Sequence, residues 1–397
     1  NSLLAVRDIN HKYIVVESRG IKMKIGILTF QASHNCGSML QAYALREVLA
    51  RKYKADVELI NYSNYVSRCM YGYIDTRLKK SSIQRNIETF THLKAVGESR
   101  KWYNDFSNKY LVKSDKYCKT PEDLKKIAKQ YDLLIAGGDQ VWNVRCQDAG
   151  KEFYLNFAKN IRKVAYSPSL GGSNILKYAD DLEAYKNYLL DFEKISVREP
   201  NGKKWLEKLT NREVPIICDP TMLLTEKEWI TWLPVPEIKE KYIFNYAFYH
   251  NRSETNEILQ KISEKTNMPI YVMDYKSYDY YKLSKYGIKK YEMSGPLAFL
   301  GLMKNASLVM TQSFHGTLFS ALFNRNFWSY DCEGQHNPED DRAIAILDQL
   351  GLKERYQMVD DLLKLDIMEK IDYEPVNKRI EEFRKISFEY IDSFMGC

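Results

Sequence analysis

The sequence of 397 residues lacks the features that mark several large classes of protein. No apolar run approaches the roughly 20 residues that a membrane-spanning helix needs. Residues 1–24 carry scattered charges instead of the apolar centre of a secretory signal peptide. The seven cysteines are an odd number without paired spacing, and neither a Cys-x-x-Cys motif nor a His/Cys cluster occurs. These absences predict a cytoplasmic protein with reduced thiols and no bound metal.

Motifs for nucleotides and for serine hydrolases are also missing. The chain contains no GxxxxGK(S/T) phosphate loop, no GxGxxG dinucleotide fingerprint and no GxSxG nucleophile turn. The sequence therefore does not indicate a nucleoside triphosphate, a dinucleotide or any other cofactor.

What the sequence does contain is excess positive charge and many tyrosines. The net charge is +7, and several of the 30 tyrosines lie among lysines at 275–282. The charge fits either a solvated, lysine-rich surface or attraction to an anionic substrate or membrane face. Because Asp and Glu lie among the tyrosines, the pattern does not predict a nucleic-acid partner. A tyrosine supplies a flat face and a hydroxyl, which suits a sugar-binding cleft.

Strands and helices alternate along the chain, as is typical of doubly wound parallel sheets. Short apolar runs predict strands at 24–30, 57–62, 131–136, 163–167, 195–198, 214–218, 242–246, 270–273, 308–311 and 327–330. Helical spacing predicts a helix capped by Ser38 and others at 124–130, 254–265, 296–304, from 316 onward, 342–350 and 376–394. Residues 64–111, rich in Lys and Tyr, predict an inserted helical or mobile subregion.

The strand–helix pattern restarts after Asp219-Pro220, and the chain is too long for one ordinary core, so two domains are expected. Residues 1–22 precede the first strand and are interpreted as an N-terminal extension. We expect an α/β fold with an N-terminal Rossmann-like domain over 23–219, carrying the insertion near 64–111. A second Rossmann-like domain with terminal helices is expected over 220–397, facing the first across a central cleft.

The most informative segment is the turn 311–316 (TQSFHG), which joins a predicted buried strand to a predicted helix. Strand carboxyl ends and helix amino ends bind anionic ligands, because free N–H groups and the helix dipole favour negative charge there. A histidine titrates near neutral pH, so His315 is a candidate general acid. The alternative is a buried histidine that bonds to the backbone while the hydroxyls cap the helix.

Two further predicted strands end in polar groups. Gly137 and Gly138 follow one of them and allow a ligand close to the backbone, while Asp139 and Asn143 supply directional polar atoms. Arg198 ends the other, and a guanidinium binds a carboxylate or phosphate with two hydrogen bonds. The alternative for Arg198 is a surface ion pair with the glutamate that follows it.

Five motifs in order carry a resemblance to a known family. They are residues 35–45 (NCGSMLQAYAL), 137–143 (GGDQVWN), 195–199 (ISVRE), 219–224 (DPTMLL) and 313–320 (SFHGTLFS). Together they resemble the polysaccharide pyruvyl transferase family, over about residues 24–355.

The resemblance implies a fold similar to the GT-B glycosyltransferases, without their sugar-nucleotide donor. It implies an enzyme that moves the pyruvyl group of phosphoenolpyruvate onto a saccharide, forming a ketal and releasing phosphate. Phosphoenolpyruvate would be a donor substrate and not a cofactor. The acceptor would be a saccharide, or a lipid-linked saccharide, of a surface polysaccharide precursor. Peripheral contact with the inner membrane face is compatible with the net charge.

Several residues match positions of the family's motifs. His315 matches the histidine that would protonate the donor's methylene carbon, and Arg198 matches a donor-binding position. The hydroxyls of Ser313 and Thr317, with the amide of Gly316, would complete an anion site at the helix amino end.

On the acceptor side, Asn35 and Gln41 match family positions in the first loop and are expected to line the cleft. Two departures concern the donor: Ser313 stands where some members carry an arginine, and Gly138 replaces a serine. Arg342 is a candidate to supply the missing charge. We therefore expect the helix amino end and distant arginines to hold the donor.

Two other functions stay open from the sequence. One is a GT-B-like glycosyltransferase that uses a sugar-nucleotide donor, and the other is a non-catalytic saccharide-binding homologue. The insertion near 64–111 is expected to help select the acceptor.

Overall fold

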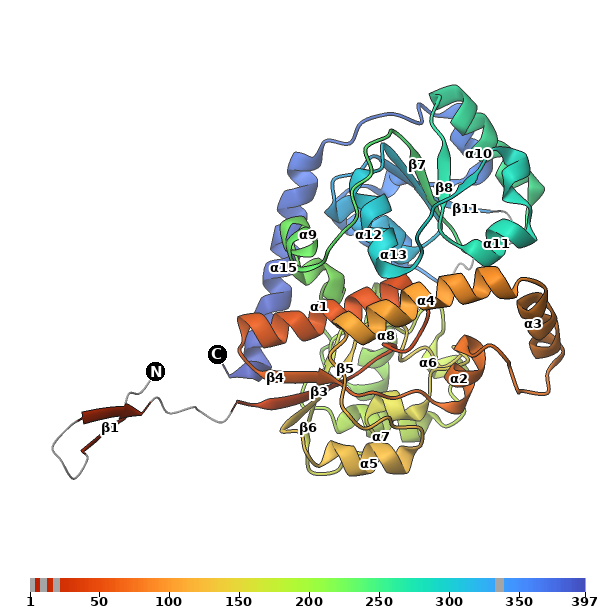
Figure 1. Ribbon diagram of the computed structural model, residues 1–397. Helices are drawn as coiled ribbons and strands as arrows, with labels where there is room; N and C mark the ends of the chain where they lie inside the picture. The colour runs from red at the N-terminus through yellow and green to blue at the C-terminus, as the bar shows by residue number, and fades with distance from the viewer. Residues whose placement is uncertain (1–3, 8–12, 17–21, 333–338, 397) are drawn as a thin grey trace.

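Two parallel β-sheets, one in each half of the chain, form the framework of the protein (Figure 1). The computed structural model describes residues 4–7, 13–16, 22–332 and 339–396. The N-terminal sheet has the order β4-β3-β5-β6, with β3 (Lys24–Leu28), β4 (Asp56–Leu59), β5 (Leu133–Gly137) and β6 (Arg162–Tyr166). The C-terminal sheet has the order β12-β11-β10-β7-β8-β9, with β7 (Ile243–Tyr246), β8 (Ile270–Val272), β9 (Lys289–Lys290), β10 (Leu308–Thr311), β11 (Phe327–Asp331) and β12 (Tyr356–Met358).

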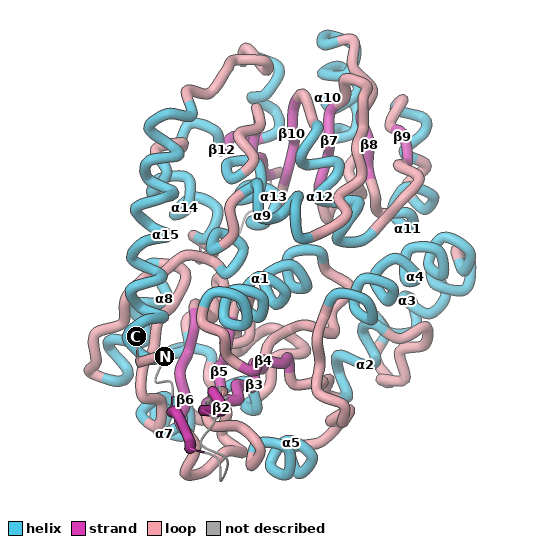
Figure 2. Tube along the Cα trace, turned by 60° about the vertical axis from the view of Figure 1, so that its left-hand side comes forward, coloured by secondary structure: helices cyan, strands magenta, loops and turns pink. Residues whose placement is uncertain are grey.

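The central strands are apolar because helices cover both faces of each sheet. Every residue of β5 and of β10 is buried. The helices that alternate with the strands return the chain to the same edge, which makes neighbouring strands parallel (Figure 2). The predicted α/β fold with two Rossmann-like domains is therefore confirmed.

In both sheets the strand order reverses beside the first strand. The reversal lies between β3 and β5 in one sheet and between β7 and β10 in the other. Loops that leave two such strands run in opposite directions and open a crevice at the carboxyl ends of the strands. The two crevices are the places where a ligand is expected to bind.

Helices in the N-terminal half cover its sheet and extend beyond it. They are α1 (Cys36–Lys52), α2 (Tyr65–Tyr71), α3 (Lys80–Thr91), α4 (Leu93–Tyr110), α5 (Pro121–Ala128), α6 (Ile175–Tyr178), α7 (Leu182–Leu190) and α8 (Pro200–Thr210). Those of the C-terminal half are α9 (Glu226–Trp232), α10 (Ser253–Thr266), α11 (Tyr275–Tyr280), α12 (Gly295–Asn305), α13 (Phe314–Leu322), α14 (Arg342–Leu350) and α15 (Tyr373–Met395).

The inserted subregion consists of α2, α3 and α4. Helix α4 packs against α11 and α12 of the C-terminal half, and the Ser99 hydroxyl lies 3.3 Å from that of Ser294. Figure 1 shows α4 running beside α1 between the two halves. The insertion therefore helps to form the boundary between the two sheets.

The last helix, α15, returns to the N-terminal half. The Tyr390 hydroxyl donates to the Ala165 carbonyl (2.8 Å), and the Ser387 hydroxyl accepts from the Cys218 N–H (2.9 Å). One apolar cluster also includes side chains of β3, α1, β10 and α15. The two halves therefore share a core, and the terminal helix expected within 220–397 also packs on the other sheet.

Several local expectations are wrong. Residues 195–198 and 214–218 are not strands, because they meet only through one isolated parallel bridge between Val197 and Ile216. The side chain of Asn35, and not Ser38, caps α1 by accepting the Ser38 N–H. Helix α13 begins at Phe314, two residues before the expected start. Within the expected extension, β1 (Leu4–Arg7) pairs antiparallel with β2 (Tyr13–Val16).

Three chemical features of the described residues bear on function. The six cysteines among them are free thiols. No helix in the described part combines the length and the apolar character needed to cross a membrane. Within the same ranges, no three His, Cys, Asp or Glu residues are grouped so that they could hold a metal ion.

Candidate functional site

A cavity of about 490 Å³ lies between the two sheets at their strand carboxyl ends. Its walls include residues that follow β3 and β5 on one side and β7, β10 and β11 on the other. Both crevices therefore open into one space. Five of the predicted site residues line this cavity: Asn35, Asp139, Ser313, His315 and Arg342.

His315 lies in the first turn of α13, where its ring is pressed between the two halves. Its side chain is 9% exposed, and Nε2 lies 3.5 Å from Oδ2 of Asp219. On the other side the ring touches the start of α1, since a Cβ added to Gly37 would lie 2.0 Å from Nδ1 of His315. Only a glycine lets the backbone of α1 approach so closely. The imidazole is thus held by a carboxylate and by the backbone of the opposite half.

Asp219 is a buried carboxylate whose acceptor sites are largely used. Its Oδ2 accepts a hydrogen bond from Nη1 of Arg198 at 2.5 Å. Its Oδ1 accepts from the N–H and the hydroxyl of Thr221 at 3.0 and 2.7 Å. Burial acts to raise the pKa of Asp219, but His315, Arg198 and Thr221 together hold it below its ordinary value. Asp219 therefore stays ionised beside the imidazole.

Arg198, which the sequence predicts to anchor the donor, does not line this cavity. Its side chain is 3% exposed, and its guanidinium carbon lies 4.1 Å from the centre of the Phe314 ring. It faces a separate cavity together with Asp219 and Phe314. Since Arg198 already pairs with Asp219, its role in this structure is to hold that carboxylate.

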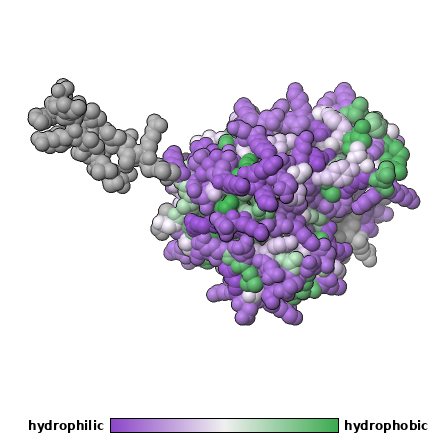
Figure 3. All heavy atoms as spheres, turned by 90° about the horizontal axis from the view of Figure 1, so that it is seen from below, coloured by the Kyte–Doolittle hydropathy of each residue, from purple (hydrophilic) through white to green (hydrophobic). Residues whose placement is uncertain are grey.

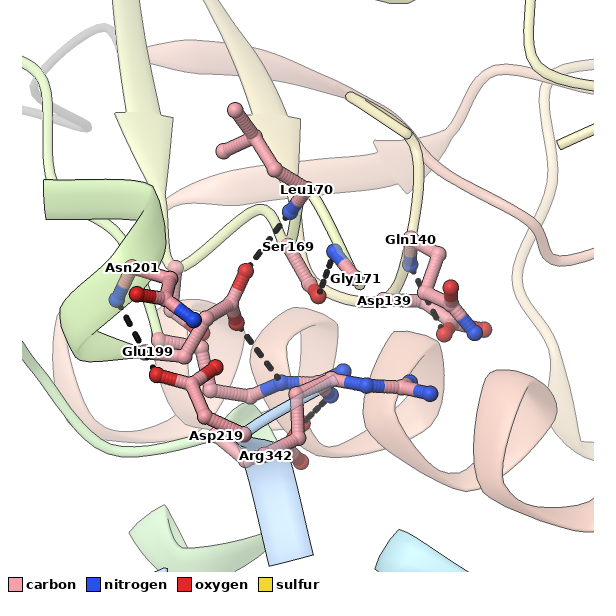
Figure 4. A network of polar contacts seen from close by, with 12 residues as sticks. Asp139, Gln140, Ser169, Leu170, Gly171, Glu199, Asn201, Asp219 and Arg342 are labelled. Carbon is pink, nitrogen blue, oxygen red and sulfur yellow. Dashed lines mark hydrogen bonds and ion pairs between the residues drawn. The ribbon is translucent and has the colours of Figure 1, made fainter. Parts of the chain in front are cut away.

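Glu199 is a second buried carboxylate in this network of polar contacts (Figure 4). Its Oε1 accepts from the Leu170 N–H at 2.7 Å, and its Oε2 lies 3.8 Å from Nε of Arg198. Burial raises the pKa of Glu199 to about 7, although Arg198 and Arg342 act to lower it. The alternative of a surface pair between Arg198 and Glu199 is wrong, because both side chains are inside the protein.

Arg342 brings a positive charge to the cavity from the start of α14. Its Nε and Nη2 donate to the two carboxylate oxygens of Asp340 at 2.7 and 2.5 Å. Burial opposes its charge, but Asp340, with Glu199 and Asp139, keeps the pKa of Arg342 above its ordinary value. Arg342 is therefore a permanent cation with one edge engaged by Asp340.

The N-terminal wall carries carboxylates. Ser38 donates a short hydrogen bond to Oδ2 of Asp139, and Oδ1 of Asp139 accepts the Gln140 N–H at 2.8 Å. Asp148 also lines this wall, and burial raises its pKa. Carboxylates accept hydrogen bonds from hydroxyl groups, and the Tyr71 ring lies on the same wall. This wall suits a polyhydroxylated ligand better than an anion.

The remaining expected residues do not line the cavity: Gln41, Gly137, Gly138, Asn143, Gly316 and Thr317. Gln41 is fully buried and donates to the Thr29 hydroxyl at 2.8 Å. Gly138 has φ +60°, and a Cβ there would lie 1.7 Å from Oε1 of Gln41. These two residues shape the loops beside the cavity and do not line it.

Three of the other four positions, Gly316, Thr317 and Asn143, make contacts within or between neighbouring elements. A Cβ on Gly316 would lie 2.0 Å from Oγ1 of Thr311, so glycine lets α13 pack on β10. The Thr317 hydroxyl donates to the Ser313 carbonyl at 3.1 Å. Asn143 donates to Oε1 of Gln140 at 2.8 Å. The expected anion site at the start of α13 therefore reduces to Ser313 and the backbone N–H groups.

A second, smaller cavity of about 200 Å³ adjoins the first through Asn35 and Phe248, which line both. Its walls come from α4 and from the carboxyl ends of β7 and β8, and they include Ser99, Tyr103 and Asn245. Oδ1 of Asn245 accepts from the Tyr330 hydroxyl at 3.0 Å, whereas its buried Nδ2 has no partner among the described residues. An unpartnered buried donor is costly, which points to a ligand in this cavity.

Sequence reasoning missed Asp219 as a site residue. The Asp219-Pro220 pair was interpreted as a domain boundary, although Asp219 opens one of the five ordered motifs. Its place in that motif is the sequence signal that could have identified Asp219 as a site residue. Its pairing with His315 joins residues 96 positions apart (315 − 219), and local spacing does not reveal such a contact.

Glu199 is expected to make stability depend on pH. Its pKa is about 7 in the folded protein against an ordinary 4.5, so between these values the folded state holds the proton more tightly than the unfolded chain. The free energy of unfolding therefore falls as pH rises through this window. Glu199→Gln keeps an oxygen for the Leu170 N–H and lacks this dependence. As pH rises through the window, the free energy of unfolding of the variant should increase by roughly 2–3 kcal/mol relative to that of the native chain.

Denaturant unfolding of both proteins across this pH range measures the effect. Glu213→Gln, at an exposed position, is the control and should follow the native chain. Parallel pH dependence in Glu199→Gln and the native chain would contradict the assignment.

Comparisons with known proteins identify the family and support the fold. A family model described as polysaccharide pyruvyl transferase matches residues 35–334. A putative UDP-N-acetylglucosamine 2-epimerase from Listeria monocytogenes is similar in structure, with a TM-score of 0.56 and 10% identity over 95% of this chain and 97% of that chain. MnaA of S. aureus in complex with UDP has a TM-score of 0.53 and 10% identity, over 95% and 97%. These similarities show a GT-B-type fold. No curated protein matches the chain in sequence.

Proposed function

The chain belongs to the polysaccharide pyruvyl transferase family, and on that premise we propose that it transfers the pyruvyl group of phosphoenolpyruvate onto a saccharide. The acceptor would be part of a surface polysaccharide precursor in the cytoplasm. Transfer forms a pyruvate ketal and releases phosphate.

The position of His315 is the observation that carries the proposal. The imidazole reaches the cavity from the first turn of α13, with the ionised carboxylate of Asp219 3.5 Å behind it. Transfer from an enol phosphate begins with a proton delivered to carbon, and this step needs a positioned acid. Asp219 lies behind the ring and orients it, and Arg198 in turn fixes Asp219.

The reaction can be written as an addition across the donor's C=C bond followed by a substitution at its C2. His315 protonates the methylene carbon, a saccharide hydroxyl attacks C2, and the proton of this hydroxyl returns to His315. A second hydroxyl then attacks C2 as the C2–O bond to phosphate breaks, and its proton leaves with the phosphate. The products are a cyclic ketal and inorganic phosphate, and no atom is oxidised or reduced.

The donor's negative charges would be held at the C-terminal side of the cavity. Ser313 caps α13 without a side-chain hydrogen bond, so the N–H groups of the first turn are available to an anion. Arg342 lines the same cavity, and a phosphate or carboxylate would bind its second edge or replace Asp340 on the first. This arrangement supplies charge that Ser313 itself does not carry.

We propose that the acceptor extends from the carboxylate-lined wall into the second cavity. No Lys or Arg occurs among the described residues that line the second cavity, which disfavours a phosphorylated ligand there. Its amides, hydroxyls and aromatic rings suit one neutral sugar ring, and Nδ2 of Asn245 would donate to a hydroxyl of that ring. Its volume of about 200 Å³ leaves room for a single small ring.

The direct test follows phosphate release and product mass with phosphoenolpyruvate and a panel of saccharides. We expect release that depends on the acceptor, and a product heavier than the acceptor by one pyruvyl ketal. The proposal fails if no acceptor stimulates release and calorimetry detects no phosphoenolpyruvate binding. Binding of a nucleotide sugar instead would indicate a sugar-nucleotide glycosyltransferase. Saccharide binding without release would indicate a non-catalytic homologue.

Gly37→Ala should lower turnover about a hundredfold, because the new methyl group forces the His315 ring away from its position. A Cβ only 2.0 Å from Nδ1 is far inside van der Waals contact. Phosphate release at saturating substrates measures the effect. Gly97→Ala, where the nearest atom to an added Cβ is 3.7 Å away, is the matched control. Native turnover in Gly37→Ala would show that the ring position does not limit catalysis.

Filling the second cavity should raise the KM for the acceptor roughly tenfold and leave that for phosphoenolpyruvate unchanged. Ser99→Phe places a ring in the cavity from α4, and Ser107→Phe, on the same helix but outside both cavities, is the control. A rise in the phosphoenolpyruvate KM alone would assign the second cavity to the donor.

A further inference from the structure

Helix α3 of the insertion turns apolar side chains to the solvent and polar ones to the protein, the reverse of an ordinary surface helix. Its buried residues are Ser82 and Thr89, whereas Ile83, Ile87 and Phe90 are 58%, 60% and 60% exposed. The spacing 83, 87 and 90 places the three apolar side chains on one face of the helix. Surface helices of globular proteins direct such a face toward the core.

Polar bonds hold α3 in this orientation. Arg85 donates to the carbonyls of Cys69 and Gly72 at 3.1 and 2.6 Å. Asn86 accepts from the N–H of Asp75 at 2.8 Å and donates to its carbonyl at 3.0 Å. These hydrogen bonds fix the polar face of α3 against the protein, and the apolar face is therefore turned to the solvent.

The exposed apolar surface continues beyond the helix. Leu78 is fully exposed and Leu93 is 50% exposed. We call Leu78, Ile83, Ile87, Phe90 and Leu93 the α3 face. Apolar side chains gather at the right-hand edge of the molecule in Figure 3, the side on which α3 lies in Figure 1. Isolated exposed apolar residues are ordinary, but a contiguous group marks an interaction surface.

Lysines lie beside the α3 face. Residues 77–94 contain five Lys or Arg and one Glu, of which Arg77 pairs with Asp75 and Arg85 is bound on the opposite face. Lys79, Lys80 and Lys94 are exposed, and the single Glu88 is paired with Lys276 at 2.8 Å. An apolar stripe with lysines beside it is the pattern of a helix that lies in the interface of an anionic membrane.

We propose that the α3 face docks the protein on a membrane that carries anionic lipid headgroups. The apolar side chains would enter the boundary between headgroups and acyl chains, and the lysines would contact the headgroups. This inference does not require pyruvyl transfer. If the proposed function also holds, α4, which follows α3 and carries Ser99 into the second cavity, would bring that cavity close to a lipid-linked acceptor.

The test is sedimentation of the full chain with vesicles of phosphatidylcholine alone or mixed equally with phosphatidylglycerol. The native chain should bind the mixed vesicles. The triple variant Ile83→Ser, Ile87→Ser, Phe90→Ser should bind at least about tenfold more weakly, because binding scales with the apolar area that enters the interface. Replacing Lys79, Lys80 and Lys94 by Glu should remove the preference for the mixed vesicles.

Three exposed apolar residues elsewhere provide a matched control, Leu190→Ser, Met368→Ser, Ile386→Ser, which should bind like the native chain. Circular dichroism checks that all variants fold. The proposal is overturned if the native chain does not sediment, or if the two triple variants bind alike. A native dimer that the α3 variant converts to monomer, without vesicle binding, would make this face an interface between copies. None of these readouts depends on phosphoenolpyruvate.

Discussion

A His315→Ala variant is expected to turn over about a thousandfold more slowly than the native chain, with little change in phosphoenolpyruvate affinity. The methyl group cannot donate the proton that activates the donor. The donor's charges, however, are assigned to Arg342 and the start of α13, which the substitution leaves in place. Phosphate release gives the turnover number, and calorimetry gives the donor dissociation constant.

His92→Ala is a suitable control, because His92 lies at the junction of α3 and α4 outside both cavities. It should keep native turnover with a water-soluble acceptor. Undiminished turnover in His315→Ala would mean that another group protonates the donor. Loss of phosphoenolpyruvate binding in His315→Ala would instead assign the ring to donor binding.

An Asp219→Asn variant should lose both activity and stability. The amide removes the carboxylate that lies behind the imidazole and holds it, so turnover should fall about a hundredfold or more. The amide also removes the carboxylate bonded to the buried Arg198 and leaves it only the longer 3.8 Å contact with Glu199, which should cost about 3–5 kcal/mol of the free energy of unfolding.

The sign of the pH effect on stability follows from the pKa of Asp219, which is lowered from its ordinary 3.8. The stabilisation is complete above pH 3.8 and is lost as pH falls through the lower folded-state value. The difference between variant and native chain should therefore be constant near neutrality and shrink in acid. Denaturant unfolding from neutral to acidic pH measures it.

Asp180→Asn is the control for Asp219→Asn. Asp180 pairs with Lys151, but both side chains are partly exposed, at 68% and 35%. This substitution should change stability far less and leave turnover at the native level. If Asp219→Asn loses stability but keeps native turnover, Asp219 is only structural.

Local patterns were enough to predict the fold. The strands 308–311 and 131–136 are recognisable because strands covered on both faces must be apolar throughout. Residues 214–218 are also largely apolar and 195–198 contain Ile and Val, yet the two segments pair through a single bridge. Whether an apolar run finds enough partners to become a strand depends on its neighbours in space and not on its own residues.

Part of the candidate site could also be predicted from local sequence patterns. His315 and Ser313 follow a strand directly, and topology alone brings such residues to the crevice. Arg198 also follows an apolar run, but Asp219 and Phe314 draw its guanidinium behind the cavity wall. A buried guanidinium needs a counter-charge, and the structure supplies it from 21 residues further along the chain.

By itself, the sequence determined the alternation of strands and helices, the two sheets and the turn that presents His315, because these depend on residues close together in the chain. Only the tertiary structure decided that Gly37 and Asp219 hold the His315 ring, that Arg198 serves Asp219, and that α3 turns its isoleucines outward. These outcomes depend on which distant groups neutralise a buried charge or satisfy a buried hydrogen bond. Such energies belong to pairs of residues in contact and are absent from any local stretch of sequence.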